Sequence, residues 1–360
     1  MKDLTASSLH RLGVLMAPRL RRDRECGGVL NPAGVLGPGD TFYLFPRLVG
    51  RDTRSRIGLA RVRRDRCGQP CSVQRLGIAL EPVAPYECPT SRGGGCEDAR
   101  VTHLAAADVY LMTYVAVGDQ GPRVALASSR DCRSWRRHGL VGLAPSAGAD
   151  VAAYANKDAL LFPEPVRAPT GEPAIALLHR PMYERWQGPR RVGALPPPAW
   201  IRDNRPSIWI SYCPTEEFGQ AIAEGHTPVF GQHHLLAAPR AWWEEDRIGG
   251  GTVPLRTQDG WLTIYHGVQR HADGTRCYRA GGLLLDADDP RQVLARSWEP
   301  LFSPETCEER RGVVDNVVFP TAAERRGAGI DVYYGMADRC VGVAHLVLDA
   351  LDTPQQERVA

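Results

Sequence analysis

The chain has 360 residues, of which 43% are hydrophobic and 24% charged, an ordinary balance for a globular protein with a sizeable buried core. The formal net charge is only +3, and no apolar run approaches the roughly 18 to 20 residues that span a bilayer, so the composition argues against nucleic acid and membrane as partners. The first residues lack a basic segment followed by an apolar core, so we expect a cytoplasmic protein with mostly reduced cysteines.

The cysteines and histidines show no spacing typical of a metal site. Cys67 and Cys71 lie four positions apart but have no second pair at zinc-like spacing. The same holds for the pair His233-His234 and for His271. We therefore predict no metal site.

Glycine and proline dominate the turns of this chain. With 37 glycines, 29 prolines and few long amphipathic windows, the sequence predicts an all-β fold. Strand-like runs recur about 65 to 85 residues apart, a spacing typical of repeat architectures. These runs are 41–45, 110–115, 174–179, 261–266 and 330–335. A second extended segment follows each run, at 57–60, 124–128, 208–211, 278–283 and 341–344.

Five such repeats predict a five-bladed β-propeller, because radial repetition leaves few free strand edges. Two packed β-sandwiches are the alternative. We expect residues 31–350 to form this single domain, residues 1–30 to be an extension packed on it or on a neighbouring subunit, and residues 351–360 to be a tail. The region 181–240 is the least regular, and its proline run 196–198 indicates an inserted loop.

Propellers carry functional groups at one end of a central channel, on loops and strand starts from each blade. Polar residues just before the recurring strands are therefore candidates, and they include carboxylates, cations and amides. The set is Asn31, Arg47, Glu97, Asp98, Arg100, Lys157, Asp158, His179, Arg180, Tyr265, His266, Asp315 and Asn316. Such a mixture fits recognition of a sugar together with an anion, since a polyol needs many hydrogen bonds and an anion needs fixed cationic donors.

The stretch from Glu97 to Arg100 is the most suggestive part of this set. Alternate residues of a strand share a face, so Asp98 and Arg100 lie together while Glu97 points to the other side. The alternative is an ion pair at a strand end with a purely structural role. Likewise, Lys157 and Asp158 can be read as a local ion pair, and Tyr265 and His266 as part of packed strands.

A series of motifs, in order along nearly the whole chain, resembles glycoside hydrolase family 130, which contains the β-mannoside phosphorylases and related β-mannosidases. The motifs are Asn31-Pro32-Ala33, Glu97-Asp98-Ala99-Arg100-Val101-Thr102, Lys157-Asp158-Ala159-Leu160-Leu161-Phe162-Pro163-Glu164, Leu178-His179-Arg180-Pro181, Ile248-Gly249-Gly250-Gly251, Gly260-Trp261-Leu262-Thr263-Ile264-Tyr265-His266-Gly267-Val268 and Asp315-Asn316-Val317-Val318-Phe319-Pro320.

The resemblance implies a five-bladed propeller and inverting chemistry on β-mannosides, with no cofactor besides inorganic phosphate as co-substrate. It implies that Asp98 is the general acid, which protonates the glycosidic oxygen through a mannose hydroxyl while phosphate attacks from the opposite face. By their place in the motifs, the phosphate-binding candidates are Arg47, Lys157 and Arg180, followed by Tyr265 and His266. The sugar-binding candidates are Asn31, Glu97, Arg100, Asp158, His179, Asp315 and Asn316.

The chain departs from the family pattern at three places. Ala99 replaces a proline after Asp98, Pro46 precedes Arg47, and the loop 183–205 is longer and more basic than expected. Such loops shape the acceptor side, so the acceptor is left open. The family resemblance is compatible with a homo-oligomer, although no sequence stripe indicates an interface.

The resemblance leaves two rival functions. The first is an inverting β-mannosidase on the same fold, in which Glu164 or Glu97 would have to be the base that activates water. The second is a non-catalytic mannoside-binding propeller. The leading hypothesis is phosphorolysis of a β-mannoside to mannose 1-phosphate and a shortened acceptor, because three cations are retained.

Overall fold

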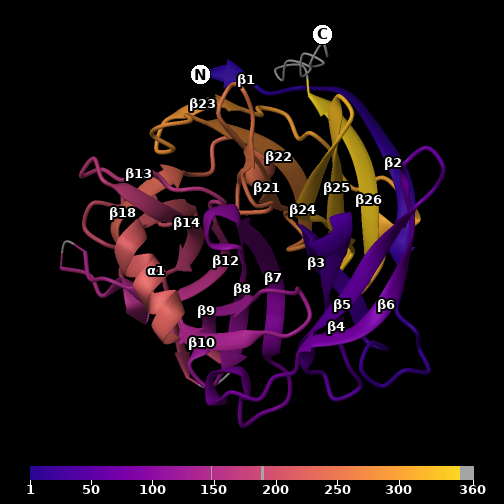
Figure 1. The fold of residues 1–360 in the computed structure, drawn as a ribbon, viewed down its shortest axis with the longest axis horizontal. Helices are drawn as coiled ribbons and strands as arrows, with labels where there is room; N and C mark the ends of the chain where they lie inside the picture. The colour runs from indigo at the N-terminus through magenta and orange to yellow at the C-terminus, as the bar shows by residue number, and fades with distance from the viewer. Residues whose placement is uncertain (147, 188–189, 349–360) are drawn as a thin grey trace.

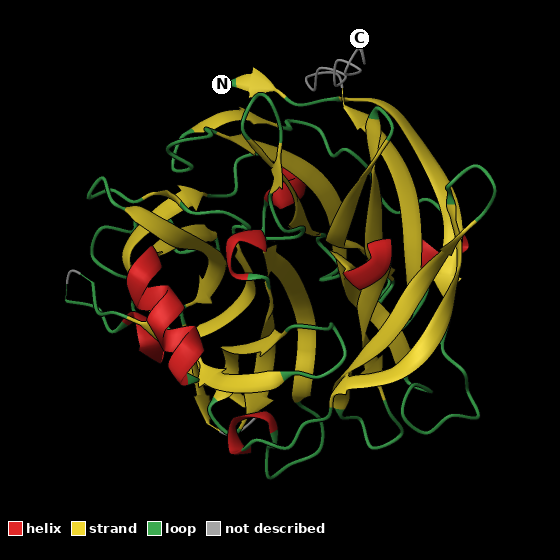
Figure 2. Ribbon diagram, viewed as in Figure 1, coloured by secondary structure: helices red, strands yellow, loops and turns green. Residues whose placement is uncertain are grey.

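The computed structural model describes residues 1–146, 148–187 and 190–348, which form an all-β fold with few helical turns (Figures 1 and 2). The all-β prediction is confirmed. Most strands fall into five antiparallel units, numbered here in chain order. The predicted tail 351–360 lies outside the described residues.

Units one and two form a continuous sheet through a single parallel pairing of Ser55 with Gly95. Unit one consists of β3 (Gly28–Gly37), β4 (Thr41–Val49), β5 (Ser55–Arg64) and β6 (Pro70–Leu80). Unit two consists of β7 (Gly95–Leu104), β8 (Val109–Gly118), β9 (Gly121–Ser129) and β10 (Arg136–Leu140).

Units three and four each carry short additional strands at their edges. Unit three consists of β12 (Ala155–Leu161), β14 (Pro173–Met182), β17 (Ile208–Pro214) and β18 (Val229–Ala237), with β11 (Gly142–Leu143) and β13 (Val166–Arg167). Unit four consists of β19 (Arg247–Gly249), β21 (Trp261–Arg270), β22 (Arg276–Leu285) and β23 (Val293–Arg296), with β20 (Leu255–Arg256) and β1 (Lys2–Asp3).

Unit five joins the two ends of the chain. Its strands are β24 (Val318–Arg326), β25 (Gly329–Met336), β26 (Cys340–Leu348) and, on the outer edge, β2 (Ala6–Met16). Figure 1 shows this junction, where the indigo β2 lies beside the yellow β26. The segment that the sequence predicted as an extension thus supplies strands to two sheets. β1 joins unit four, and β2 covers an edge of unit five that would otherwise present unpaired backbone groups.

The predicted strand pattern agrees closely with these units. The five predicted runs fall in β4, β8, β14, β21 and β25, the second strand of each unit, and the five second segments fall in the third strands. The predicted inserted loop contains a hairpin formed by β15 (Glu184–Gln187) and β16 (Arg190–Ala194). Two α-helices, α1 (Thr215–Glu224) and α2 (Cys307–Arg310), and the 3-10 turns η1 (Pro38–Asp40), η2 (Pro85–Glu87), η3 (Ala105–Ala107), η4 (Val151–Ala153) and η5 (Trp242–Glu244) complete the described structure.

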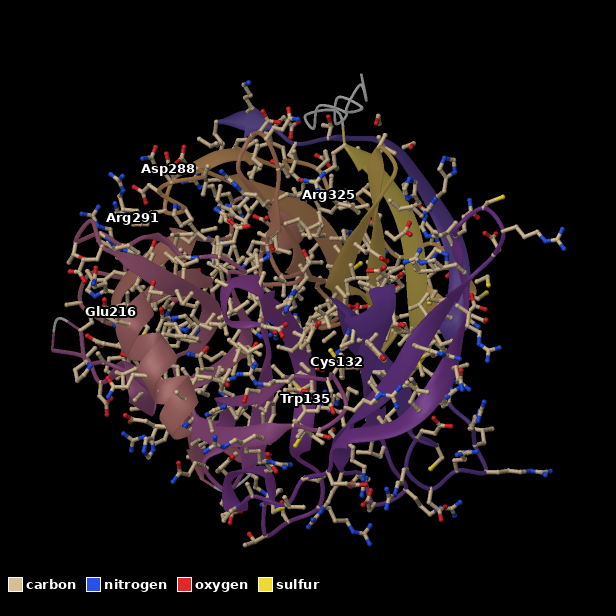
Figure 3. All side chains as sticks on the ribbon, in the orientation of Figure 1. Cys132, Trp135, Glu216, Asp288, Arg291 and Arg325 are labelled. Atoms are coloured by element: carbon tan, nitrogen blue, oxygen red, sulfur yellow. The ribbon has the colours of Figure 1, made fainter. Side chains whose placement is uncertain are left out.

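The apolar core lies between neighbouring sheets. Separate clusters join unit one to two, two to three, three to four and four to five, and a further cluster places Phe42 of unit one against Tyr333 of unit five. Figure 3 shows the inward-lying Cys132 and Trp135 of the first cluster, whereas Glu216, Asp288 and Arg291 lie near the periphery. Each unit therefore buries both of its faces against its neighbours.

Three buried carboxylates fasten the connections between units in the same way. Glu87, Glu244 and Glu309 each lie in a helical turn before a unit, and each accepts hydrogen bonds from the backbone N–H groups of the two residues just before that turn. Each also accepts a hydrogen bond from the hydroxyl of a tyrosine on the second strand of the following unit. A guanidinium on the fourth strand of that unit donates a further one. We call these sets the inter-unit clamps: Glu87–Tyr114–Arg137, Glu244–Tyr265–Arg296 and Glu309–Tyr334–Arg11.

Candidate active site

Four side chains project from left-handed backbone positions at the start of the first strands. Asn31, Asp98 and Asp158 have φ of 44°, 46° and 55°, and each lies at a break in the register between the first and second strands. Asn316, with φ of 59°, lies two residues before the first strand of unit five. Asn and Asp tolerate this region better than other side-chain-bearing residues, and a bulge re-aims the side chain it carries.

Unit four has glycines at the corresponding place. A Cβ atom on Gly249 would lie 2.2 Å from Asp158 Oδ2 and 2.5 Å from His266 Cε1, and one on Gly250 would lie 2.9 Å from the Asp158 carbonyl oxygen. Glycine is therefore required here because the backbone of unit four approaches the side chains of unit three.

Asp98 lies at the centre of the charged side chains that these strands bring together. It is 8% exposed, accepts a hydrogen bond from Asn31 Nδ2 at 2.9 Å, and lies 3.4 Å from Arg47 Nη1. Burial by itself would raise the pKa of Asp98, but the cations Arg47 and Lys157 and the Asn31 amide bring it below its usual value. The Asp98 carboxyl is thus ionised in the free protein at neutral pH.

Two cations reach the same place from different units. Arg47 donates to Glu97 Oε1 at 2.7 Å and to Ser55 Oγ at 2.9 Å, and Lys157 Nζ lies 3.6 Å from Glu97 Oε2. The side chains of Arg47 and Lys157 keep 21% and 26% of their surface exposed. Glu97, expected on the opposite face from Asp98, shares Arg47 with it because the bulge at Asp98 breaks the strand alternation.

A second buried group lies beside the first. Arg180 Nε donates to Asp158 Oδ2 at 2.5 Å, and His266 Nε2 lies 3.7 Å from the same oxygen. Burial would raise the pKa of Asp158, but Arg180, His266 and Arg100 lower it, whereas burial lowers the pKa of His266 to about 3. His266 is therefore neutral, and its buried Nδ1 has no hydrogen-bond partner among the described residues.

Arg100 donates to backbone carbonyl oxygens, so its role differs from those of Arg47 and Arg180, which bond carboxylates. It is 1% exposed and donates to the carbonyl oxygens of Asp98, Ala99 and Gly251. Its donors thus hold the bulge at Asp98 against the glycine segment of unit four. Arg100 is a positioning residue rather than a residue that faces a cavity.

The structure does not bring Tyr265 and His179 into this group. Tyr265 lies on the opposite face of β21 from His266 and donates to Glu244 in an inter-unit clamp. His179 is 1% exposed and bonds Asn156 Nδ2 at 2.8 Å and Ser211 Oγ at 2.7 Å. Strand alternation separates each of them from the neighbouring residue that does join the group.

Of the pair before the first strand of unit five, Asp315 is exposed and accepts a hydrogen bond from the Gly312 amide at 3.1 Å, so its carboxylate fixes a turn. Asn316 is half-buried, and its carbonyl accepts the Tyr278 amide at 2.9 Å. Its left-handed backbone, shared with Asn31, Asp98 and Asp158, keeps Asn316 a candidate.

Asp338 is a carboxylate that the sequence search missed, because it follows a predicted strand of unit five instead of preceding one. It lies in the turn between β25 and β26, with φ of 52°. Burial, opposed by Arg47 and reinforced by Asp98 and Glu97, raises the pKa of Asp338 to about 6. Asp338 therefore belongs to the same electrostatic environment as Asp98.

We call the resulting group the central cluster. It consists of Asn31, Arg47, Glu97, Asp98, Lys157, Asp158, Arg180, His266 and Asp338. No three His, Cys, Asp or Glu side chains among the described residues are arranged to hold a metal ion. All ten cysteines lie in the described residues, and none is in a disulfide.

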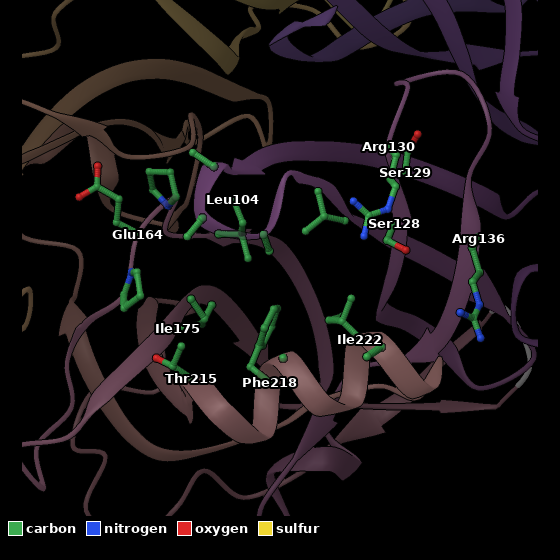
Figure 4. Close-up of a pocket in the computed structure, with 18 of the residues that line it drawn as sticks. Leu104, Ser128, Ser129, Arg130, Arg136, Glu164, Ile175, Thr215, Phe218 and Ile222 are labelled. Carbon is green, nitrogen blue, oxygen red and sulfur yellow. The ribbon is translucent and has the colours of Figure 1, made fainter.

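Glu164 lies at the opposite end of the strands. It lines a cavity of about 710 Å³ together with Leu104, Phe218 and Ile222, and Figure 4 shows it at one end of this largely apolar cavity. Leu104 ends β7, six residues from Asp98, which at about 3.3 Å per residue is roughly 20 Å along the strand. Glu164 is therefore remote from the central cluster.

The family model described as beta-1,4-mannooligosaccharide phosphorylase matches residues 22–353. The chain belongs to glycoside hydrolase family 130. It is 30% identical to the 1,2-beta-oligomannan phosphorylase of a Thermoanaerobacter species over 346 residues, which are 92% of this chain and 94% of that protein. It is 31% identical to a beta-1,2-mannobiose phosphorylase of the same organism, over 92% of this chain and 93% of that protein.

Solved structures agree with the fold. The beta-1,2-mannobiose phosphorylase of Listeria innocua in complex with beta-1,2-mannobiose superposes with a TM-score of 0.68 at 22% identity, over 94% of this chain and 96% of that one. No helix among the described residues is long and apolar enough to cross a membrane.

Proposed function

We propose that the protein catalyses inverting phosphorolysis of β-mannosides, which yields α-mannose 1-phosphate and a shortened acceptor. The observation that carries this proposal is the central cluster, in which Asp98 faces the partly exposed cations Arg47 and Lys157. The 30% and 31% identical relatives, both phosphorylases of β-mannosides, support the same reaction.

We also propose that the five units are the blades of a β-propeller. Apolar clusters join each unit to the next and unit five to unit one, which is the contact pattern of a closed ring. The first strands then line the axis, and their left-handed positions present Asn31, Asp98, Asp158 and Asn316 at one end. This architecture explains why residues far apart in sequence share one cluster.

In this mechanism Asp98 supplies the proton that the departing glycosidic oxygen requires. The free Asp98 carboxyl is ionised because Arg47 and Lys157 lie close to it. A phosphate dianion that takes up the donors of these cations weakens their field and raises the pKa of Asp98. Phosphate is then required twice, as nucleophile and as the group that allows Asp98 to hold a proton.

Phosphate attacks the anomeric carbon from the face opposite the leaving oxygen. Its oxygen forms the new bond as the carbon–oxygen bond to the acceptor breaks, and the proton passes from Asp98 to the acceptor oxygen through a mannose hydroxyl. Asn31 and Asp338 are proposed as partners for the mannose hydroxyls, since Asn31 Oδ1 is buried without a hydrogen-bond partner among the described residues.

Hydrolysis is the rival reaction, and it needs a carboxylate base beside the attacking water. Glu97 is engaged by Arg47 at 2.7 Å and by Lys157 at 3.6 Å, so its carboxylate oxygens already have cationic partners. Glu164 is remote. Neither of the two carboxylates nominated from the sequence as the base is therefore well placed to activate a water molecule.

For the linkage we propose β-1,2. Two relatives that match over more than nine tenths of this chain are named for β-1,2-mannosides, although the description of the family model names a β-1,4-mannooligosaccharide. We further propose a cytoplasmic protein that acts on free oligosaccharides without a metal or organic cofactor.

The test is product formation from β-1,2-mannobiose and β-1,4-mannobiose with and without phosphate, together with phosphate release from mannose 1-phosphate over a panel of acceptors. We expect cleavage only with phosphate, and faster for the β-1,2 compound. Undiminished cleavage in phosphate-free buffer would instead establish a hydrolase. Binding of mannosides without cleavage of any would establish a non-catalytic binding protein.

A further inference from the structure

An exposed tryptophan stands above unit three, at the end of the unit where Lys157 and Arg180 lie. Trp200 belongs to the segment between β16 and β17, which returns the chain to this end of the sheet, since Trp209 near the start of β17 pairs with His179. The Trp200 side chain packs on Trp209 at 4.8 Å between ring centroids, and Trp209 meets the ring of His179 at 6.1 Å. A column of rings thus runs from Trp200 to the residue next to Arg180.

The column is fixed by the surrounding chain. Trp209 is completely buried, and Ile201, next to Trp200, is 8% exposed. The segment before Trp200 contains the proline run 196–198, and Tyr154 Oη donates to the Pro196 carbonyl at 2.8 Å. Because prolines limit backbone rotation, Trp200 is held in place while 36% of its surface stays exposed.

The position of Trp200 relative to the central cluster suits a sugar unit next to the reacting one rather than the reacting unit itself. β17 lies two strands away from β12, which carries Lys157 and Asp158, and two strand spacings are about 10 Å. We therefore expect a mannosyl unit bound at the cluster to leave the position over β17 to a further unit of a longer acceptor chain.

The exposed indole ring of Trp200 offers a pyranose a flat apolar surface. One face of a pyranose carries C–H groups, and these pack against the face of an aromatic ring that is already fixed and partly desolvated. Other exposed tryptophans are placed differently: Trp242 is covered by the Arg279 guanidinium at 4.8 Å and bonds Glu299, and Trp298 lies in unit four beyond β23.

We propose that Trp200 is an aromatic platform that binds a mannosyl unit of the acceptor chain, beyond the unit next to the cleaved bond. The proposal rests on the proposed function and adds its substrate class: β-mannooligosaccharides of three or more units are preferred over mannobiose. Trp200 is a specificity-determining residue in this view, and it leaves phosphate and mannose 1-phosphate binding untouched.

The experiment compares kcat/KM for phosphorolysis of β-1,2-linked mannobiose, mannotriose and mannotetraose by the wild type, Trp200→Ala, Trp200→Phe and the control Trp298→Ala. We expect Trp200→Ala to lower kcat/KM about tenfold for the tri- and tetrasaccharide and less than twofold for the disaccharide, as loss of one aromatic contact predicts. Trp200→Phe should retain most of the preference, and Trp298→Ala all of it. Melting temperatures establish that every variant is folded.

An equal loss at all three lengths, or no loss, would overturn the platform. Calorimetric affinities of the same oligosaccharides separate this result from failure of the proposed function. If the wild type cleaves none of them, phosphorolysis fails, and the platform stands only if Trp200→Ala weakens binding of the longer chains selectively. If the wild type cleaves them without any length-dependent effect of Trp200→Ala, the platform alone fails.

Discussion

The inter-unit clamps and the central cluster both bury carboxylates beside arginines, but they leave different groups free. In the clamp of Glu309, both carboxylate oxygens are satisfied, by two backbone amides, Tyr334 and Arg11. In the central cluster, Asn31 Oδ1 and His266 Nδ1 are buried without hydrogen-bond partners among the described residues, and Arg47 and Lys157 stay partly exposed. The clamp therefore has no polar group left for a ligand, whereas the central cluster has unpartnered groups beside partly exposed cations.

The pKa values follow the same division. Burial alone would raise the pKa of Glu309, but Arg11, the backbone amides and Tyr334 lower it. In the central cluster, the pKa of Asp98 is lowered whereas that of Asp338 is raised to about 6, so two neighbouring carboxyls lose their protons at different pH values. Divergent pKa values within one small group are typical of catalytic sites.

We expect the largest effect on activity from substitution of Asp98, which lies at the centre of the central cluster. Asp98→Asn keeps the shape and the bond from Asn31 but cannot give up a proton, so kcat for phosphorolysis should fall about 1,000-fold, within the range for general acid catalysis. The measurement is mannose 1-phosphate release at saturating phosphate. More than a tenth of wild-type activity in the purified variant would remove Asp98 from the mechanism.

The same kind of change in a clamp should act on folding instead. Glu244→Gln removes the negative charge that faces Arg296 at 2.7 Å and should lower the free energy of unfolding by about 3 to 5 kcal/mol. Chemical denaturation measures the effect. The matched control Glu299→Gln, at an exposed carboxylate, should change stability by less than about 0.5 kcal/mol. Equal effects in the two variants would contradict the role assigned to the clamps.

Lys157 tests the phosphate side of the central cluster. Lys157→Met should raise the KM for phosphate about tenfold or more and leave folding intact, because the charge-assisted hydrogen bond to an anion is lost. Lys157→Arg, which keeps the charge, should recover a large part of the loss. A raised KM for the mannoside with an unchanged KM for phosphate would place Lys157 at the sugar instead.

Asp338 gives the smallest effect, and it depends on pH. Its pKa is raised in the folded protein from about 4 to about 6, so its contribution to stability is fully present below pH 4 and is lost as the pH rises through 6. Asp338→Asn escapes this loss, so it should gain roughly 1 to 2 kcal/mol relative to wild type between pH 4 and pH 7.5. Thermal unfolding at both pH values measures the difference. A constant difference would show that Asp338 does not titrate in this range.

The repeat was predictable because strand runs and glycine-rich turns are local signals, and each predicted run lies in the expected strand of its unit. Asp98, Arg47, Lys157 and Arg180 were nominated through motifs. The structure places Arg47 beside both Glu97 and Asp98, Lys157 beside Glu97, and Arg180 beside Asp158. The inter-unit clamps were not predictable, because Glu309 meets Arg11 almost 300 residues away. Tyr265 was assigned to phosphate because sequence spacing alone does not tell which face of a strand carries the central cluster.

The role of the N-terminal segment was also beyond sequence reasoning. β2 lacks the regular alternation of an ordinary strand, because Leu9, Leu12 and Leu15 are three residues apart and its register against β26 shifts three times. Only its pairing with β26 in unit five shows that it is a strand. Asp338 was missed for a related reason: it lies in a turn after a strand, and its neighbours Arg47 and Asp98 come from other units.

The most direct test of the account is ³¹P NMR of the wild-type protein with β-1,2-mannobiose and inorganic phosphate. The account predicts a growing signal of α-mannose 1-phosphate, matched by an equal amount of free mannose as the released acceptor. Accumulation of mannose from both sugar units, with no new phosphorus signal, would contradict it.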